Sequence, residues 1–190
     1  MEEDQLVNFV DDILQNRNLE GNSPKWANWM SLLTPTTCKF CMEHHGKIVD
    51  ISILRGKSKV EAHTWCKCKY VAMRTKLVGT ATDLNIEGAD IYIMYFGRLP
   101  DYYVSFDFAK DAGWRAKRGN LNEVLPGKMI GGDLYKNRDG KLPQVPGRMW
   151  YEADINYEGG HRNRQRILYS NDGLVFVSYD HYQTFYEIID

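Results

Sequence analysis

The stretch that decides the fold is residues 149–182, which read MWYEADINYEGGHRNRQRILYSNDGLVFVSYDHY. Residues 149–155 alternate, so Trp150, Glu152 and Asp154 should face one way and the residues between them the other. A loop with two glycines precedes a second predicted strand, 166–170, and the turn signal Asn171-Asp172-Gly173 sends the chain back. With further strands expected over 174–178 and 183–188, the sequence predicts an antiparallel meander.

One face of this meander can gather four ionisable side chains: Glu152, Arg162, Arg166 and His181. A carboxylate and an imidazole can share proton removal and proton donation near neutral pH. Two guanidinium groups suit a phosphodiester, because their planar fork meets phosphate oxygens in a bidentate way. From composition and spacing alone, however, the commoner explanation is a half-buried sheet with solvated charges on its open face.

Longer stretches of the sequence favour a catalytic site over a sheet with solvated charges. Over residues 89–188 the chain resembles the small bacterial guanyl-preferring ribonucleases of the barnase family. The matching words are LPDYYV, AGWRAKRGNL, PGKMIGGDLYKNRDGKLP, GRMWYEADINY, RNRQRILYS and DHYQTF. The resemblance implies an α+β fold in which helices precede a twisted antiparallel sheet that carries the active site.

The resemblance also implies a reaction, the metal-independent transesterification of single-stranded RNA to a 2′,3′-cyclic phosphate. Glu152 takes the proton of the ribose 2′-hydroxyl, and His181 protonates the departing 5′-oxygen. Arg162 and Arg166 neutralise the charge that develops on the phosphoryl oxygens. DNA lacks the 2′-hydroxyl and cannot undergo this step.

By the same resemblance, the loop over residues 135–140 recognises guanine. Asp139 stands where the family usually has glutamate, and its shorter side chain leaves the strength of base preference open. Asp154 and Arg138 are expected to order the site by ion pairing, and Tyr182 to border the phosphate or stack on a base. The residues expected to bind substrate are Tyr135, Lys136, Asn137, Arg138, Asp139, Tyr182 and Lys110.

Phe106 is a second departure, because it occupies the position of the family's catalytic lysine. Ser105 is expected to cap the helix that begins there. Lys110 lies one helical turn later on the same face and is our candidate replacement. Without the lysine, we expect activity to persist at a reduced level.

The four cysteines fall within 31 residues and form a second candidate site. Cys38, Cys41 and Cys66 are the expected ligands of a structural zinc ion, with either Cys68 or His63 as the fourth. A metal would stabilise a segment with so little apolar content. Disulfides and free thiols are the alternatives. CKFCMEHHGKIV and HTWCKC are similar to the Cys/His-rich segment of phage head-morphogenesis proteins, which also occurs ahead of toxin domains.

The sequence suggests two regions, a helical and zinc-binding-like part over residues 1–80 and a barnase-like domain over 81–190. Helices are expected over residues 3–16 and 24–33. Residues 38–76 contain nine basic residues against three acidic ones, a difference of six. This basic surface could contact RNA phosphates or the acidic N-terminal helix, but more often such a surface is merely solvated.

Composition limits the remaining choices. A hydrophobic share of 43% and a charged share of 26% are typical of a globular protein, and the net charge of −1 gives no sign of a polyelectrolyte partner. The acidic start does not resemble a signal peptide, and no apolar run is long enough to cross a bilayer. We therefore expect a protein that is cytoplasmic as synthesised and, as a bacterial or prophage-borne toxin, reaches other cells by a non-Sec route.

The expected partners are single-stranded RNA, a barstar-like acidic inhibitor protein, and a delivery or phage protein docked on the N-terminal region. The alternative function is a weakly active or inactive RNA- or protein-binding module within a phage-structural or interaction protein.

Overall fold

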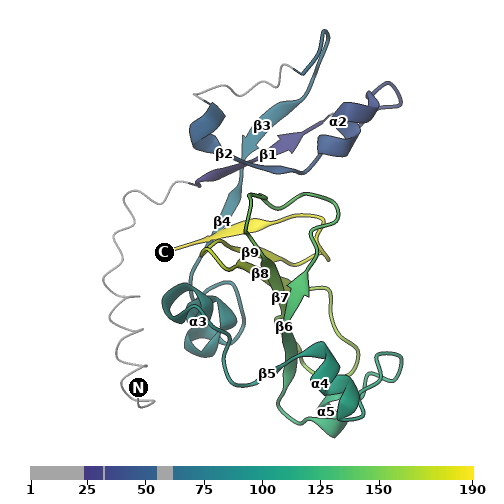
Figure 1. The fold of residues 1–190 in the computed structure, drawn as a ribbon, viewed down its shortest axis with the longest axis vertical. Helices are drawn as coiled ribbons and strands as arrows, with labels where there is room; N and C mark the ends of the chain where they lie inside the picture. Colours follow the sequence, from purple (N-terminus) through teal and green to yellow (C-terminus); the bar gives the residue numbers. More distant parts are fainter. Residues whose placement is uncertain (1–23, 32, 55–61) are drawn as a thin grey trace.

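The computed structural model describes residues 24–31, 33–54 and 62–190, which form two β-sheets and several short helices (Figure 1). The helix expected over residues 3–16 lies outside these ranges. In the described part of the chain, no helix is both long and apolar enough to cross a bilayer.

The larger sheet has seven strands in the order β4-β10-β9-β8-β7-β6-β5. Its strands are β4 (Arg74–Leu77), β5 (Tyr103–Val104), β6 (Met129–Tyr135), β7 (Trp150–Asp154), β8 (Arg166–Ser170), β9 (Val175–Ser178) and β10 (Tyr186–Ile189). Neighbouring strands from β6 to β10 are antiparallel, whereas β4 and β5 pair in parallel at the two edges. Helices α3 (Ala89–Phe96), α4 (Phe106–Asp111) and α5 (Leu121–Val124) precede β6. The α+β class and the meander are therefore confirmed.

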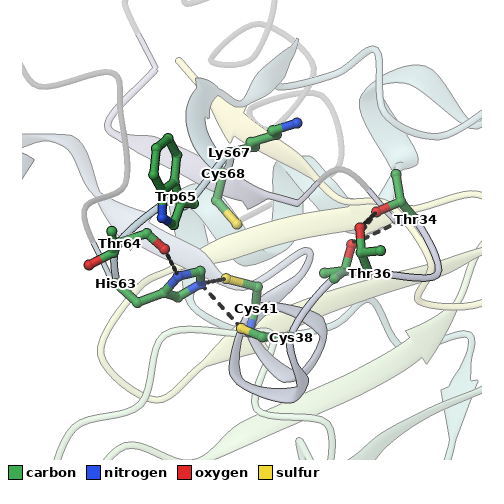
Figure 2. A pocket seen from close by; sticks show the side chains of 10 residues that line it. Thr34, Thr36, Cys38, Cys41, His63, Thr64, Trp65, Lys67 and Cys68 are labelled. Atoms are coloured by element: carbon green, nitrogen blue, oxygen red, sulfur yellow. Dashed lines mark hydrogen bonds between the residues drawn. The ribbon is translucent and has the colours of Figure 1, made fainter.

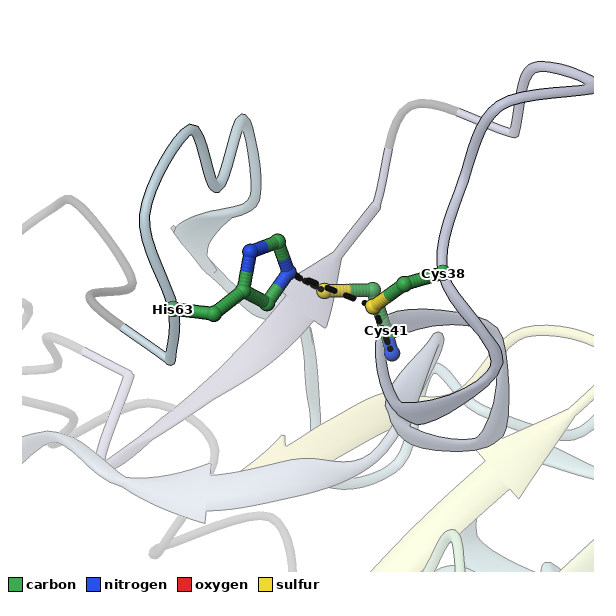
Figure 3. Close-up of side chains that lie close together, drawn as sticks. All are labelled: Cys38, Cys41 and His63. Carbon is green, nitrogen blue, oxygen red and sulfur yellow. Dashed lines mark hydrogen bonds between the residues drawn. The ribbon is translucent and has the colours of Figure 1, made fainter.

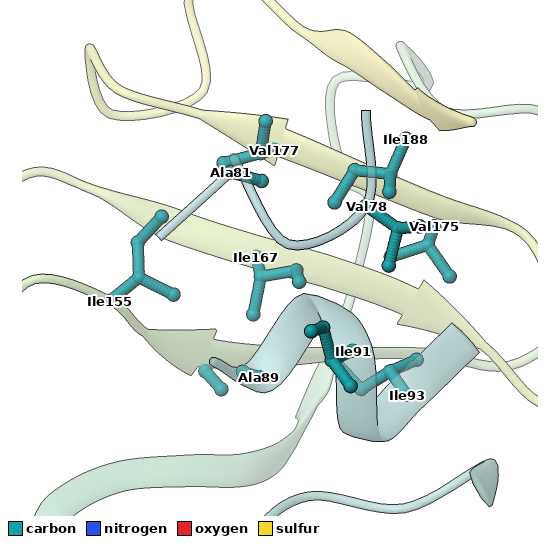
Figure 4. Packing of buried hydrophobic residues seen from close by; sticks show 11 residues of the cluster. Val78, Ala81, Ala89, Ile91, Ile93, Ile155, Ile167, Val175, Val177 and Ile188 are labelled. Atoms are coloured by element: carbon teal, nitrogen blue, oxygen red, sulfur yellow. The ribbon is translucent and has the colours of Figure 1, made fainter. Parts of the chain in front are cut away.

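Helix α3 covers one face of this sheet, as the packing in Figure 4 shows. Because side chains alternate along a strand, Ile167 of β8 and Val177 of β9 point to the same face. Both are fully buried, as is Ile91 of α3. Burial of each such side chain contributes about 1.5–3 kcal/mol, so this cluster holds the helix on the sheet.

The opposite face carries the predicted alternation of β7. Glu152 is paired with Leu168, and Asp154 with Arg166, so these side chains share a face. The apolar part of that face, around Trp150, is covered by residues of the N-terminal region such as Ile48 and Met73. The ionisable part beside it forms the candidate site.

The smaller sheet has the order β2-β1-β3, with β1 (Trp26–Met30), β2 (Ile48–Asp50) and β3 (Lys69–Ala72). The prediction of a helix over residues 24–33 was wrong, because β1 pairs with β2 on one side and with β3 on the other. These long-range backbone bonds override the local apolar spacing. Helix α2 (Lys39–His44) and a 3₁₀ turn (Ile51–Leu54) also belong to this part of the chain.

The segment that connects β4 to α3 is held by Asp90 at the start of α3. Its buried carboxylate accepts hydrogen bonds from the backbone N–H groups of Gly79 (2.7 Å) and Ala81 (3.0 Å). Strand β4 pairs with β10, and Val78 is fully buried in the core under α3. Residues that precede position 80 therefore contribute to the larger sheet and its core.

Candidate active site and cysteine cluster

The centre of the candidate site is the buried carboxylate of Asp154, at the end of β7, which is 1% exposed. It accepts hydrogen bonds from Nε and Nη2 of Arg162, both at 2.6 Å, and forms an ion pair with Nε of Arg166 at 3.0 Å. Burial opposes the charged form of Arg162, but Asp154 outweighs burial and raises the pKa of this guanidinium. Asp154 therefore holds both arginines in place, which agrees with the expected ion pairing.

Glu152 lies two residues earlier on the same face and accepts a hydrogen bond from the Tyr182 hydroxyl. The Tyr182 ring stacks on Tyr135, with centroids 5.1 Å apart, and tilts against the His181 ring at 4.8 Å. Burial and the neighbouring Glu152 carboxylate raise the pKa of Tyr182, so its hydroxyl stays protonated and donates. Tyr182 thus links the carboxylate of Glu152 to the imidazole of His181.

The backbone at His181 and Tyr182 is strained, because both residues adopt left-handed conformations, with φ of 61° and 66°. Two hydrogen bonds maintain this corner. The His181 N–H donates to the carbonyl of Arg164 (2.9 Å), and the Tyr182 N–H donates to the Ser178 hydroxyl (2.9 Å). The corner therefore joins the backbone of His181 to the loop that carries Arg162 and leads to Arg166 at the start of β8.

Strand β10 begins three residues later than predicted because of the turn that follows this corner. The Asp180 carboxylate accepts hydrogen bonds from the backbone N–H groups of Gln183 (3.1 Å) and Thr184 (2.9 Å). Those groups are therefore not available to a sheet ladder, and the strand starts at Tyr186.

Phe106 lies at the edge of the site, at the start of α4. Ser105 caps this helix as predicted, and the Asp133 carboxylate also accepts a hydrogen bond from the Phe106 N–H (2.9 Å). The Phe106 ring contacts two cations: Nζ of Lys110 lies 4.5 Å from its centroid, and Cζ of Arg162 lies 6.0 Å from it. The ring therefore connects Lys110 to the site indirectly, through packing.

The loop that follows β6 is closed by Asn137, which has a φ of 43°. Its side-chain amide donates to the Leu142 carbonyl (2.9 Å) and accepts from the Leu142 N–H (3.1 Å). Lys136, Arg138 and Asp139 are exposed on this loop. Within the described ranges Arg138 forms no ion pair, so the ion pairing expected of it is not observed.

Lys141 is a residue that the sequence did not single out. Its Nζ donates to the carbonyl of Tyr182 (2.9 Å), and its own carbonyl accepts from the Ile48 N–H of β2 (2.8 Å). It therefore joins the loop after β6, the His181–Tyr182 corner and the N-terminal region. These contacts span residues far apart in the chain, so no local pattern could indicate them.

The second candidate site is the cysteine cluster, which lines a pocket in the N-terminal region (Figure 2). His63 Nε2 lies 3.2 Å from the sulfur atoms of both Cys38 and Cys41 (Figure 3). The Cys41 sulfur is 3.9 Å from that of Cys66, and Cys41, Cys66 and Cys68 form a second close group. The structure therefore brings together all five predicted ligands.

This donor set fits a zinc ion. Zinc–sulfur bonds of about 2.3 Å and zinc–nitrogen bonds of about 2.0–2.1 Å in a tetrahedron place ligand atoms roughly 3.5–3.8 Å apart. The spacings of 3.2–3.9 Å in the cluster lie close to that range. The His63 Nδ1 atom contacts the Thr64 carbonyl at 2.7 Å, an arrangement that points Nε2 toward the thiols.

Comparison with known proteins matches residues 94–189 to a family model described as ribonuclease. A ribonuclease from Heyndrickxia coagulans is 50% identical over 104 residues, which are 55% of this chain and 95% of the relative. A ribonuclease from Bacillus intermedius is 50% identical over 115 residues, 60% of this chain and 71% of the relative, and one from Bacillus pumilus matches to the same extent. The residues that match the family model contain the candidate site of the large sheet and exclude β1, β2 and β3.

Proposed function

Because the chain belongs to the barnase family of ribonucleases through its C-terminal part, we propose that it cleaves single-stranded RNA by transesterification at the Asp154-centred site. The observation that carries the proposal is the link from Glu152 through Tyr182 to His181, beside two arginines held by Asp154. A general base, a general acid and positive charge are the groups that this reaction needs.

In the proposed reaction, Glu152 accepts the proton of the ribose 2′-hydroxyl while the 2′-oxygen forms a bond to the adjacent phosphorus. The bond from phosphorus to the 5′-oxygen breaks, and His181 donates its proton to that oxygen. Arg162 and Arg166 stabilise the negative charge on the phosphoryl oxygens during both steps. The products are a 2′,3′-cyclic phosphate and a free 5′-hydroxyl, and no metal takes part.

Guanine preference is the finer proposal for the loop after β6. Lys136, Arg138 and Asp139 are exposed there, and Tyr135 stacks on Tyr182 at the base of the loop. An aspartate oxygen can accept hydrogen bonds from the guanine edge, although it reaches less far than the glutamate of relatives. The preference is therefore expected to be weaker than that of a glutamate-bearing loop.

The test is cleavage of a single-stranded RNA in EDTA by the wild type and by Glu152→Ala and His181→Ala. Each substitution is expected to lower kcat by at least about a hundredfold. Glu123→Ala is the matched control, because Glu123 is exposed on α5, outside the site. Full activity of Glu152→Ala, or equal losses in Glu152→Ala and the control, would contradict the proposal.

A second candidate function follows from Phe106. With an aromatic ring where the family has a catalytic lysine, the same sheet face could bind RNA without turning it over. Tight binding of RNA by the wild type with no cleavage in EDTA would identify such a binding module. Measurable turnover that depends on Glu152 would exclude it.

For the N-terminal region, we propose a structural zinc ion held by Cys38, Cys41 and Cys66. Either His63 or Cys68 completes the shell, and the 3.2 Å spacings from His63 Nε2 to Cys38 and Cys41 favour His63. The metal would hold together α2 and the segment before β3, a small part of the fold with few buried apolar side chains. Metal analysis of the purified protein should give about one zinc per chain, and His63→Ala should lower that content more than Cys68→Ala.

We further propose the biological role of a bacterial toxin, with residues 1–80 as a docking region and residues 81–190 as the effector. An acidic inhibitor protein would then protect the producing cell, since the arginines and exposed basic loop residues of the site complement negative charge. An inhibitor of this kind should compete with RNA for the site. Binding without competition would contradict this part of the proposal.

A further inference from the structure

A groove of about 430 Å³ lies between the three-stranded sheet and the segment that follows the candidate active site. One side is formed by β1 and β3, and the other by residues 183–186. Arg74, at the start of β4, also lines it. The groove is therefore lined by residues of both the N-terminal region and the ribonuclease fold.

The β1–β3 side of the groove follows from strand alternation. Met30 is paired with Lys69, and Asn28 with Val71, so these four side chains share one face of the small sheet. The intervening Ala27 and Trp29 are buried on the opposite face. Val71 remains 40% exposed although it is apolar, which indicates that its face is open to solvent.

The lining of the groove is basic. Of the described residues that line it, Lys69, Arg74 and His45 are basic, and none is an aspartate or a glutamate. Among the described residues neither Lys69 nor Arg74 forms an ion pair, and the Arg74 guanidinium donates to the Tyr186 hydroxyl (3.3 Å) and lies over its ring. The nearby carboxylate of Asp180 accepts hydrogen bonds within its own turn. Two cations are therefore available to a negatively charged ligand.

The groove is connected to the candidate active site through the chain segment after Tyr182 and through Lys141. Residues 183–186 directly follow His181 and Tyr182, and the Tyr182 carbonyl accepts a hydrogen bond from Lys141 Nζ. Gly46, which also lines the groove, approaches the Lys141 side chain, since a Cβ placed on this glycine would lie 3.7 Å from Lys141 Cε. Positive charge thus extends from the site, through Lys141, toward Lys69 and Arg74.

We propose that this groove binds the sugar–phosphate backbone of the RNA substrate beyond the two nucleotides at the scissile bond. The inference rests on the proposed function and extends it, because it assigns part of the RNA site to residues outside the matched family region. Cationic grooves track the backbone of single strands, and each phosphate contact releases bound counterions. The proposed occupant is RNA because the groove is basic and part of its lining, residues 183–186, directly follows His181 and Tyr182 of the site at which RNA is cleaved.

The experiment compares the cleavage of two substrates by the full chain. One is the dinucleoside monophosphate guanylyl-adenosine, which is too short to reach from the scissile bond into the groove. The other is an eight-nucleotide RNA with a single central guanosine. The readout is the ratio of kcat/KM for the octamer to kcat/KM for the dinucleoside, in the wild type and in Lys69→Ala/Arg74→Ala.

The double variant is expected to lower this ratio on the order of tenfold. For the octamer, the slope of log kcat/KM against the logarithm of the salt concentration should become shallower by about 1.4, because two phosphate contacts are lost. Lys39→Ala/Lys67→Ala is the charge-matched control, because both lysines are exposed in the N-terminal region and neither lines the groove. The control is expected to keep the wild-type ratio. An unchanged ratio in Lys69→Ala/Arg74→Ala, or the same loss in the control, would overturn the inference.

Two further measurements separate folding and catalysis from groove binding. Lys69→Glu alone reverses an exposed charge and should give the same direction of change if the double variant is unstable. Fluorescence anisotropy of the octamer on Glu152→Ala reports binding without cleavage. If binding depends on Lys69 and Arg74 but the wild type cleaves neither substrate, the groove is supported and the catalytic proposal fails.

Discussion

Asp154→Asn is the substitution that tests most strongly how the site is held together. Asparagine keeps the shape of the side chain but removes the charge that faces Arg162 and Arg166. These arginine side chains are 22% and 6% exposed, so neither can recover full hydration. One of the two bonds from Arg162 would also meet an amide N–H instead of an oxygen.

The size of the effect follows from this geometry. Removing one member of a buried ion pair costs about 3–5 kcal/mol, because the remaining charge is left without a counter-charge. For a chain of this length, such a loss lowers Tm by roughly 10 °C. The two guanidinium groups would also lose their orientation, and a displacement of about 1 Å at a reacting centre can lower kcat/KM for RNA about a hundredfold.

The assay is urea unfolding together with RNA cleavage, and Asp172→Asn is the matched control. Asp172 also holds one arginine in a bidentate pair, Arg148, and this partner lowers the pKa of the Asp172 carboxyl. Its side chain is 42% exposed, so solvent screens the pair and its loss should cost only about 1 kcal/mol. If Asp154→Asn destabilises no more than Asp172→Asn and cleaves RNA at a similar rate, the assigned role of Asp154 is wrong.

Four further predictions follow from single side chains. Tyr182→Phe removes the hydrogen bond to Glu152 and should lower kcat for RNA about tenfold with little change in stability, measured by steady-state cleavage and thermal unfolding. Phe106→Lys places a cation at the edge of the site and should raise kcat/KM for RNA cleavage about tenfold or more. An unchanged kcat/KM would mean that Arg162 and Arg166 already supply the positive charge that the reaction needs. Cys41→Ser removes the sulfur common to both cysteine groups and should release the metal, measured as zinc per chain, with a lower Tm. Burial raises the pKa of the Asp90 carboxyl in the folded protein. The contribution of this group to stability is therefore largest below its pKa in the unfolded chain, and it is lost as the pH rises through its pKa in the folded protein. Asp90→Asn should accordingly lower the free energy of unfolding more near pH 4 than at pH 7, measured by urea unfolding.

The sequence predicted the sheet well where the signals are local. The turn at Asn171-Asp172-Gly173 and the cap at Ser105 depend on residues close in the chain, and both are confirmed. Strand β1 could not be recognised in this way. Its apolar residues fit a helix as well as a strand, and the decision comes from backbone pairing with β2 and β3, which begin about 20 and 40 residues later.

In the candidate site too, the sequence predicted the features that depend on nearby residues and not those that depend on distant residues. Alternation along β7 correctly places Glu152 and Asp154 on one face, and cysteine spacing correctly indicates the cluster. The positions of His181 and Tyr182 depend on strained backbone and on hydrogen bonds to distant residues, so spacing alone could not place them. The basic groove is likewise formed by segments more than 100 residues apart.

The central claim, that a ribose 2′-hydroxyl attacks the phosphorus at this site, has a direct test. An eight-nucleotide RNA with one guanosine is incubated with the wild type in EDTA. The same oligomer carrying 2′-deoxyguanosine at that position is incubated in parallel, and the masses of the products are measured by mass spectrometry. The expected result is a fragment ending in a 2′,3′-cyclic phosphate from the first oligomer, and no cleavage at the 2′-deoxyguanosine of the second. Cleavage of both oligomers at the same bond, or a fragment without the cyclic phosphate at the earliest times, would contradict it.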